Sequence, residues 1–267
     1  KTTVDVPFEV KSWIDKNSLV EKTMWTLYSN PKTKHLIFDI KNINKIRKLL
    51  MGYNYTQSLQ VMKILPDLKS RIVQQNLPHD IERLQCIFLE SFPINILAVY
   101  EISKSSGAKT PGIDGKCFST ISMKRENYIN QQLIGTRYKK SGKSFKVKKD
   151  LPKNAVITED IMKHLKLELS EEIFKFRFQL LQQCNLKTIR KNYKGSIIRR
   201  VWIPKKNPGE YRPLGVPILK DRVLQQIIVW GIFPISESQA DALSFGFRPK
   251  RSAMQAIAYL YRKLSKS

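Results

Sequence analysis

The sequence predicts an α+β fold that is mostly helical and has a small antiparallel β-hairpin. Apolar residues recur at helical spacing in several segments, which is typical of helices that bury one face. A run with β-branched residues at 197–203 leads into a turn at 206–209, and a second extended run follows, which is typical of a hairpin. Because 42% of the 267 residues are apolar, the chain can bury a real core.

Residues 1–80 are predicted to form a helical N-terminal extension. Within it, segment 42–50 has an apolar stripe beside a basic face, formed by Ile43, Ile46, Leu49 and Leu50. That basic face could lie on RNA, although a solvated outer face explains it as well. Leu77-Pro78 predicts a break, and a second helical pattern runs from 80 to 102, continuing across Pro93.

Two irregular segments follow. Residues 107–115 hold too many turn formers for a regular element, and the Asp114 side chain is suited to cap a tight turn there. Segment 137–149 interleaves cations with Tyr138 and Phe145, as a strip that follows a nucleic-acid backbone and stacks on bases would require. A disordered basic loop is the alternative. The cations proposed to bind RNA here are Arg137, Lys139, Lys140 and Lys143.

The predicted hairpin has cations at both shoulders, namely Arg199, Arg200, Lys205, Lys206 and Arg212. The two-residue period of a strand would bring some of them to one face, beside Trp202 or Tyr211. Fixed guanidinium and ammonium groups suit a polyphosphate or a nucleic-acid backbone, because they donate charge-assisted hydrogen bonds to phosphate oxygens. A solvated edge hairpin protected by Lys and Pro is the alternative.

Two further helices are predicted after the hairpin. The first begins at Asp221 and Arg222, which could form a structural ion pair, and has an apolar side through residue 230. The second runs from 252 to 264, after a bend at 244–249 that its glycine permits. Further candidate RNA-binding cations are Arg222, Arg248, Lys250 and Arg251.

The charge balance indicates a polyanionic partner. The chain has 48 basic and 22 acidic residues, a net charge of +26. Such an excess opposes compact folding unless a polyanion neutralises it, so nucleic acid is the expected partner. The basic residues are spread along the chain and not gathered on one amphipathic helix, which argues against a membrane surface. No run of about 20 apolar residues exists, so no membrane span is expected.

Cysteine and histidine spacing indicates no metal site. The three cysteines, Cys86, Cys117 and Cys184, are far apart and show no CxxC spacing. Structural zinc and a disulfide framework are therefore not expected, and a reducing compartment fits. Frequent Lys, Asn and Ile suggest an AT-rich genome, from which we expect an organellar location, most simply mitochondrial.

Four short motifs carry a resemblance to a known family. They are Lys109–Gly115, Arg199–Lys205, Arg212–Pro217 and Ser244–Pro249. In this order they resemble the amino-terminal half of the reverse transcriptases encoded by group II introns, the intron maturases. The resemblance extends over residues 84–264. It implies a reverse-transcriptase fingers-like domain at 81–267, with a basic insertion near 116–191.

The resemblance also implies roles for particular residues. Lys205 and Arg212 match the cations that hold the triphosphate of an incoming nucleotide. Lys109 and Asp114 lie in a loop near template and nucleotide, while Arg199 and Arg200 would stand near the template or RNA backbone, with Lys206 beside them.

The carboxylates needed for polymerisation are not found in this sequence. A polymerase needs two metal ions held by carboxylates, and in the family an Asp-Asp pair supplies part of the set. No Asp-Asp pair occurs in the 267 residues. We therefore expect no cofactor in this chain, with Mg²⁺ required only together with a palm, and no primer extension by this polypeptide alone.

Two functions remain open from the sequence. In the first, the chain is the fingers part of a group II intron reverse transcriptase and maturase, with palm and thumb truncated or on a second chain, and binds intron RNA for splicing. In the second, it is a polymerase-inactive remnant that serves as an RNA-binding component of a ribonucleoprotein, such as a mitochondrial ribosome.

Overall fold

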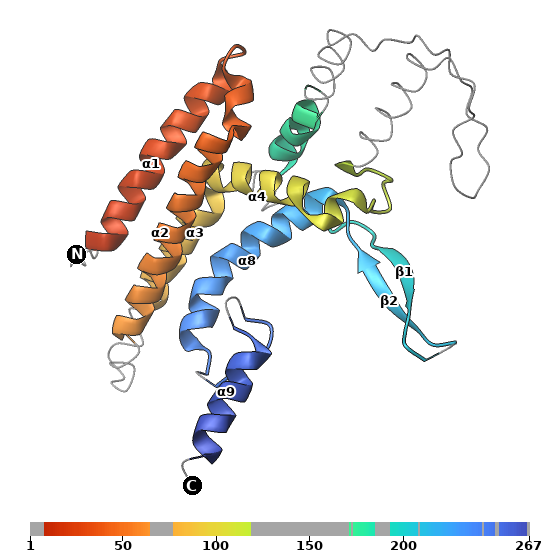
Figure 1. Cartoon of the computed structure of the whole chain (residues 1–267). Helices are drawn as coiled ribbons and strands as arrows, with labels where there is room; N and C mark the ends of the chain where they lie inside the picture. The colour runs from red at the N-terminus through yellow and green to blue at the C-terminus, as the bar shows by residue number, and fades with distance from the viewer. Residues whose placement is uncertain are drawn as a thin grey trace, which may run out of the picture.

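The computed structural model describes residues 8–64, 77–118, 171, 173–184, 193–207, 209–241, 243–248 and 251–265. In these parts the chain is mostly helical and has a two-stranded antiparallel sheet, which confirms the predicted α+β fold. Figure 1 shows a helical body from which the β-hairpin projects to one side, with the C-terminal helix at the lower end.

The described elements follow one another in a simple order. They are α1 (Phe8–Ser29), the 3₁₀ helix η1 (Lys34–Phe38), α2 (Ile40–Ile64), α3 (Leu77–Glu90), α4 (Phe92–Lys104), the 3₁₀ helix η4 (Ser106–Lys109), β1 (Arg199–Pro204), β2 (Tyr211–Val216), α8 (Leu219–Gln239) and α9 (Ala253–Leu264). A further helical stretch covers 173–183.

The N-terminal helices α1 and α2 pack against each other and against α3. Trp13 of α1 is buried between them, and its indole Nε1 donates to the Leu49 carbonyl of α2 at 2.9 Å. Its ring lies 5.1 Å from that of Tyr53 and 6.4 Å from that of Phe88, which belongs to α3. The apolar stripe predicted for segment 42–50 faces this core, since Ile43 and Ile46 are fully buried.

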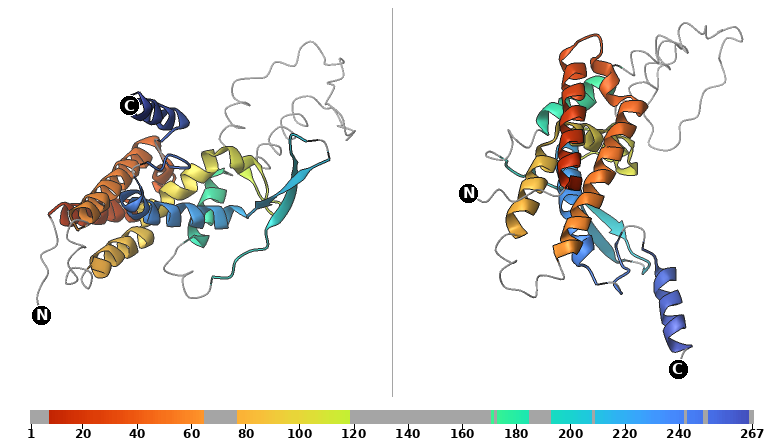
Figure 2. Two further views of the ribbon diagram at one scale, coloured as in Figure 1. Left: turned by 90° about the horizontal axis from the view of Figure 1, so that it is seen from below. Right: turned by 90° about the vertical axis from the view of Figure 1, so that its left-hand side faces the viewer.

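Helix α4 runs through the centre of the helical body, as Figure 2 shows. Its residues from 92 to 99 are all buried, because α1, α2 and α8 contact it from different sides. The chain bends by 62° between α3 and α4. The helical pattern predicted across Pro93 is therefore two helices, α3 and α4. Ser91 lies at the bend between them, and its hydroxyl donates to the buried Asn17 side chain of α1 at 2.8 Å.

Helix α8 connects the helical body to the hairpin. Pro234 lies inside it and cannot donate a backbone hydrogen bond, which weakens the helix locally. One turn earlier, the Gly231 carbonyl accepts from the Gln85 side chain of α3 at 2.9 Å. A side chain at Gly231 would meet Leu89 at 2.9 Å, so the glycine permits α3 and α8 to pack closely.

A single buried cluster includes side chains from both predicted domains. The cluster contains Val10 from the predicted N-terminal extension, and Phe88 and Ile227 from the predicted fingers-like domain. The boundary predicted near residue 80 falls in the first turn of α3. Among the described helices, none is by itself long and apolar enough to cross a bilayer; α3 and α4 reach that length and composition only together, across their bend.

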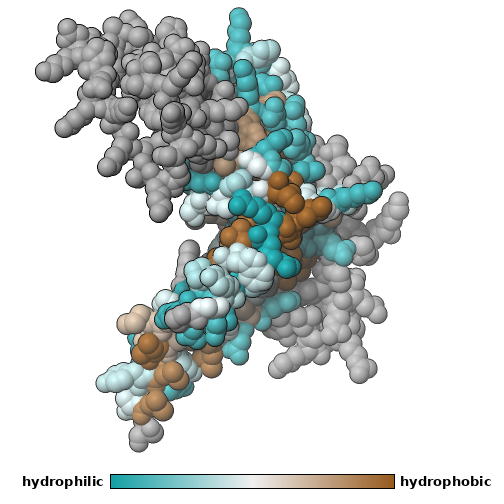
Figure 3. All heavy atoms as spheres, turned by 90° about the vertical axis from the view of Figure 1, so that its right-hand side faces the viewer, coloured by the Kyte–Doolittle hydropathy of each residue, from teal (hydrophilic) through white to brown (hydrophobic). Residues whose placement is uncertain are grey.

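Helix α9 begins with a complete capping box. Ser252 accepts from the Gln255 backbone N–H, and the Gln255 side chain accepts from the Ser252 N–H. This confirms the helix predicted at 252–264. None of its side chains is buried, and Figure 3 shows its apolar side chains in brown at the lower end of the molecule.

Candidate nucleic-acid interface

The register of the hairpin assigns its side chains to two faces. Strands β1 and β2 pair antiparallel, with Trp202 opposite Pro213 and Ile203 opposite Arg212. Directly opposed residues point to the same side of a sheet. One side, here called the cationic face, therefore holds Arg199, Val201, Ile203, Arg212, Leu214 and Val216. Lys205 and Glu210 form the next pair on this face, since the Lys205 N–H donates to the Glu210 carbonyl at 2.9 Å. The other side, the aromatic face, holds Arg200, Trp202, Pro204, Tyr211 and Pro213.

Cations gather around a hollow at the tip of the hairpin. The hollow has a volume of about 440 Å³ and is lined by Pro204, Lys205, Lys206, Asn207 and Arg212. The turn that closes the tip uses Gly209 at φ +84°, a conformation that favours glycine. These lining residues are all exposed, so the hollow offers three cationic groups to an anion from solvent.

The ion pair within this hollow is weakly held. Lys205 Nζ lies 3.2 Å from Glu210 Oε2, and each side chain is 51% exposed. Exposed pairs of this kind contribute only about 0–1 kcal/mol, because water screens them. An incoming phosphate can therefore replace Glu210 as the partner of Lys205 at little cost.

The aromatic face combines a cation with exposed rings. Trp202 and Tyr211 are each 58% exposed. The Arg200 guanidinium carbon lies 5.9 Å from the centre of the Trp202 ring, within cation–π range. The sequence pattern predicted a cation beside an aromatic residue on one face, and the structure places Arg200 and Trp202 there. Lys205 and Arg212 lie on the opposite face.

The first turn of α8 anchors the hairpin through Asp221. This carboxylate is buried, and it accepts from the Tyr193 hydroxyl at 3.1 Å and from the Ser196 backbone N–H at 3.4 Å. Partial burial and the bond to Asp221 raise the pKa of Tyr193. The segment that leads into β1 is thereby fixed to the helix that leaves β2.

Arg222, the next residue, ties the same helix end to residues 107–115, here called the glycine-rich loop. Its guanidinium donates to three backbone carbonyls: Pro217 at 2.8 Å, Gly107 at 2.6 Å and Thr110 at 2.8 Å. Burial lowers the pKa of Arg222. Asp221 and Arg222 thus bond to other groups and not to each other, and the Arg222 guanidinium is occupied inside the fold.

The glycine-rich loop packs tightly beneath the hairpin. A side chain at Gly112 would come within 2.8 Å of the Ile218 Cα, so only glycine allows this approach. Gly115 has φ +67°, and the Asp114 carboxylate accepts from the Lys116 N–H at 3.2 Å, which is the capped turn predicted as one reading of this loop. Lys109 is exposed at the end of η4.

Arg199 joins this loop to β1. Its Nη1 donates to the Pro111 carbonyl at 3.2 Å, while the side chain stays exposed. The structure therefore brings Lys109, Asp114, Arg199 and Arg222 to the base of the hairpin, with Lys205, Lys206 and Arg212 at its tip.

Arg248 is occupied within the bend between α8 and α9. It binds Glu237 through Nε at 2.9 Å and Nη2 at 2.6 Å, and it also donates to the Asp241 and Ser244 carbonyls. Hydrogen bonds from Arg248 lower the pKa of Glu237, and they raise the pKa of Arg248 in return. Arg251 lies 3.9 Å from the same carboxylate.

Some predicted site residues lie outside the described residues. They are Lys250 and the insertion cations Arg137, Lys139, Lys140 and Lys143. In the described part of the chain, no group of three His, Cys, Asp or Glu side chains is placed to hold a metal ion. The cysteines of this part form no disulfide with one another, and burial raises the pKa of Cys184 to about 12.

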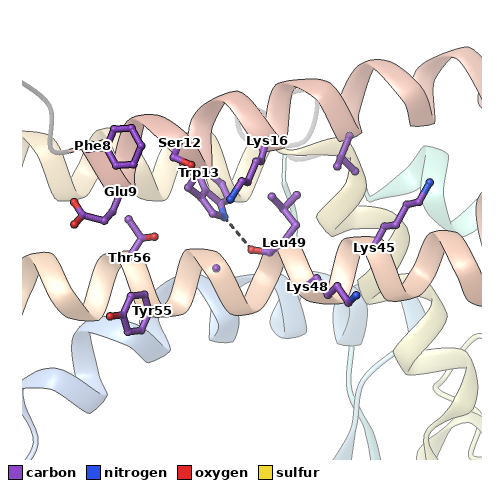
Figure 4. Close-up of a pocket in the computed structure, with 12 residues that line it drawn as sticks. Phe8, Glu9, Ser12, Trp13, Lys16, Lys45, Lys48, Leu49, Tyr55 and Thr56 are labelled. Carbon is purple, nitrogen blue, oxygen red and sulfur yellow. Dashed lines mark hydrogen bonds between the residues drawn. The ribbon is translucent and has the colours of Figure 1, made fainter.

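A second hollow lies between α1 and α2, on the side of the body away from the hairpin (Figures 1 and 4). Its volume is about 510 Å³. Trp13 and Leu49 line it with apolar surface, and Lys16, Lys45 and Lys48 stand beside them. Two of these lysines belong to the basic face predicted for segment 42–50. No residue of the four motifs lines this hollow.

Sequence reasoning missed two contributors to the interface. Asn207 lines the tip hollow, and Asp221 fixes the base of the hairpin. The turn composition at 206–209 could have indicated the first. The second depends on a contact between residues 28 positions apart, for which the sequence gives no signal.

Comparison with known proteins points to one class. No known protein-family profile matches the chain. Part of the chain, however, is similar in sequence to proteins encoded by group II introns. This similarity supports a region related to group II intron reverse transcriptases and maturases, which is part of what the motifs predicted.

Two curated relatives show how far the sequence similarity extends. The group II intron-encoded protein LtrA of Lactococcus lactis subsp. cremoris is 36% identical over 66 residues, 25% of this chain. Protein YkfC of Escherichia coli K12 is 52% identical over 59 residues, 22% of this chain. The matched segments cover 11% of LtrA and 15% of YkfC, so the chain spans a small part of these curated relatives.

Proposed function

We propose that this chain binds group II intron RNA through the cationic hairpin, as the fingers part of a reverse transcriptase and maturase. The observation that carries the proposal is the hollow at the hairpin tip, where Lys205, Lys206 and Arg212 stand together and exposed. The sequence similarity to an intron-encoded protein supports the choice of RNA.

The hairpin cations are available to a ligand, in contrast to two other arginines of the predicted site. Arg222 and Arg248 bond to carbonyls and carboxylates of the chain itself. Lys205 has only an exposed ion pair, which a phosphate can displace. Charge-assisted bonds from Lys and Arg to phosphate oxygens are shorter and stronger than neutral ones, and Arg can bind a phosphate through two nitrogens at once.

The same cations could serve template-directed DNA synthesis. In that role Lys205 and Arg212 hold the triphosphate of an incoming nucleotide, and the loop with Lys109 and Asp114 lies near the template. Magnesium-binding carboxylates of a palm would supply the chemistry of phosphoryl transfer. This chain would bind and orient RNA and nucleotide in such an assembly.

Salt-dependent RNA binding tests the proposal. The Lys205→Ala/Arg212→Ala double variant is compared with Lys11→Ala/Lys22→Ala, which removes two exposed cations from α1. Binding to a group II intron transcript is measured by fluorescence anisotropy over a range of salt concentrations. We expect the hairpin variant to bind more weakly. Its salt slope, meaning the steepness of the log binding constant against log salt concentration, should fall by about 0.7–0.9 for each lost phosphate contact.

The control variant separates a local site from general charge. It should bind almost as the wild type does, because its cations lie away from the hairpin (Figure 1). Equal losses in the two double variants would contradict the proposal, since they would show that only the net charge matters.

A further inference from the structure

We propose that the aromatic face of the hairpin is a stacking platform for unpaired bases of a single-stranded nucleic acid. This inference rests on the proposed function, because the cationic face and the tip would hold the backbone of the same strand. It assigns a separate task to Trp202 and Tyr211, with Arg200 extending the platform.

The geometry of the aromatic face suits stacking. Trp202 and Tyr211 are diagonal neighbours, because each ring faces a proline on the opposite strand: Pro213 faces Trp202, and Pro204 faces Tyr211. Prolines add rigid apolar surface and no polar side-chain group between the rings. More than half of each ring residue is exposed, although both are large side chains with apolar surface to bury.

The charges around the rings favour a nucleic acid over a protein surface. The Arg200 guanidinium already lies over the Trp202 ring, and guanidinium planes stack on bases as aromatic rings do. Glu210 is the only acidic residue between 193 and 220, and it pairs with Lys205 on the cationic face. No carboxylate on the aromatic face therefore repels a phosphate backbone.

The two faces would divide recognition between backbone and base. Lysine and arginine groups at the tip attract phosphates regardless of sequence, and this part of the affinity falls with salt. Aromatic rings stack on any base, and this part is insensitive to salt. A strand that crosses the hairpin edge can use both at once. A duplex cannot, because its bases are already stacked and paired.

The test compares polymers with and without bases. The probes are an oligouridylate of about 10 nucleotides and an abasic ribose-phosphate oligomer of the same length. The variants are Trp202→Ala and Tyr211→Ala, with Trp202→Phe and Tyr211→Phe as conservative partners. Tyr261→Ala is the matched control, because Tyr261 of α9 is an exposed aromatic residue outside the hairpin.

We expect a loss that depends on the bases. Each alanine variant should bind oligouridylate roughly fivefold or more weakly, as measured for single stacking residues, and should bind the abasic oligomer as the wild type does. The salt slope should stay unchanged. The phenylalanine variants and the Tyr261 control should retain oligouridylate binding. Circular dichroism checks that each variant is folded.

Several outcomes would overturn the platform. One is an equal loss, or no loss, for both oligomers in the alanine variants. Another is that these variants abolish self-association in sedimentation without any base-dependent change, which would make the face a protein contact. If the wild type binds the abasic oligomer as tightly as oligouridylate, with a steep salt slope, the platform fails and the proposed function stands. If it binds neither, both fail.

Discussion

Replacing Arg222 by alanine should loosen the base of the hairpin and destabilise the whole chain. The guanidinium donates three hydrogen bonds to backbone carbonyls, two of them to residues more than 100 positions away. Hydrogen bonds from a charged donor contribute about 1.5–3 kcal/mol each when buried. Because the Thr110 carbonyl bond is exposed and Arg222 itself is only half-buried, we assign about 1 kcal/mol to each bond. The expected loss is about 3 kcal/mol.

Urea unfolding measures this loss. The free energy of unfolding is obtained from the midpoint and slope of the transition. Arg222→Lys is the informative second variant: an ammonium group keeps the charge, but it cannot match the planar fork of the guanidinium. Arg222→Lys should recover only about a third of the free energy of unfolding that Arg222→Ala loses, that is about 1 kcal/mol. Amide hydrogen exchange at residues 107–115 should become faster in both variants.

Arg199→Ala is the matched control, because Arg199 also joins the hairpin to this loop. Arg199 makes one hydrogen bond to the Pro111 carbonyl, which is 3.2 Å long and exposed to solvent. Loss of this bond should lower the free energy of unfolding by less than about 0.5 kcal/mol. The reasoning is refuted if Arg222→Ala unfolds at the same urea concentration as Arg199→Ala. It is also refuted if Arg222→Ala lowers the salt slope of RNA binding while leaving stability intact.

Three further predictions concern the loop, α9 and the bend before it. Gly112→Ala should cost about 1–3 kcal/mol in urea unfolding, because the new Cβ would meet the Ile218 backbone at 2.8 Å. Ser252→Ala should remove the capping box, at a cost to α9 of about 1 kcal/mol, and speed amide exchange in its first turn. Glu237→Gln should be less stable than the wild type at neutral pH. Since bonds from Arg248 lower the pKa of Glu237 in the folded chain, this difference should vanish as pH falls through that lowered value; a difference that persists at low pH contradicts the assignment.

Local patterns predicted the elements of this fold well, because each depends on neighbours in the chain. The stripe of segment 42–50 faces the core, and the turn formers Asn207 and Gly209 lie in the turn that closes the hairpin. Strand alternation also predicted a cation beside an aromatic residue on one face, where the structure has Arg200 and Trp202. In each case the period of the element decides which side chains share a face.

The sequence could not show which cations remain available to a ligand. Arg199 lies in one motif and Arg222 lies shortly after the next, and both have the same chemistry. Yet Arg222 is occupied by three carbonyls, and Arg199 is exposed. This difference arises because residues 107–110, far away in the sequence, pack against Arg222 in the folded chain. Likewise, Glu237 neutralises Arg248 only because the bend brings residues 11 positions apart together.

The hairpin is attached to the helical body through one end of α8, so substitutions at its tip and at its base should have different effects on folding. Residues 205–207, 209 and 210 are exposed, so changes in charge there should leave the folded core intact. Changes at Asp221, Arg222 or Gly112 would disturb every part that meets at that helix end. The tip of this hairpin should therefore tolerate substitution, and the residues at its base should not.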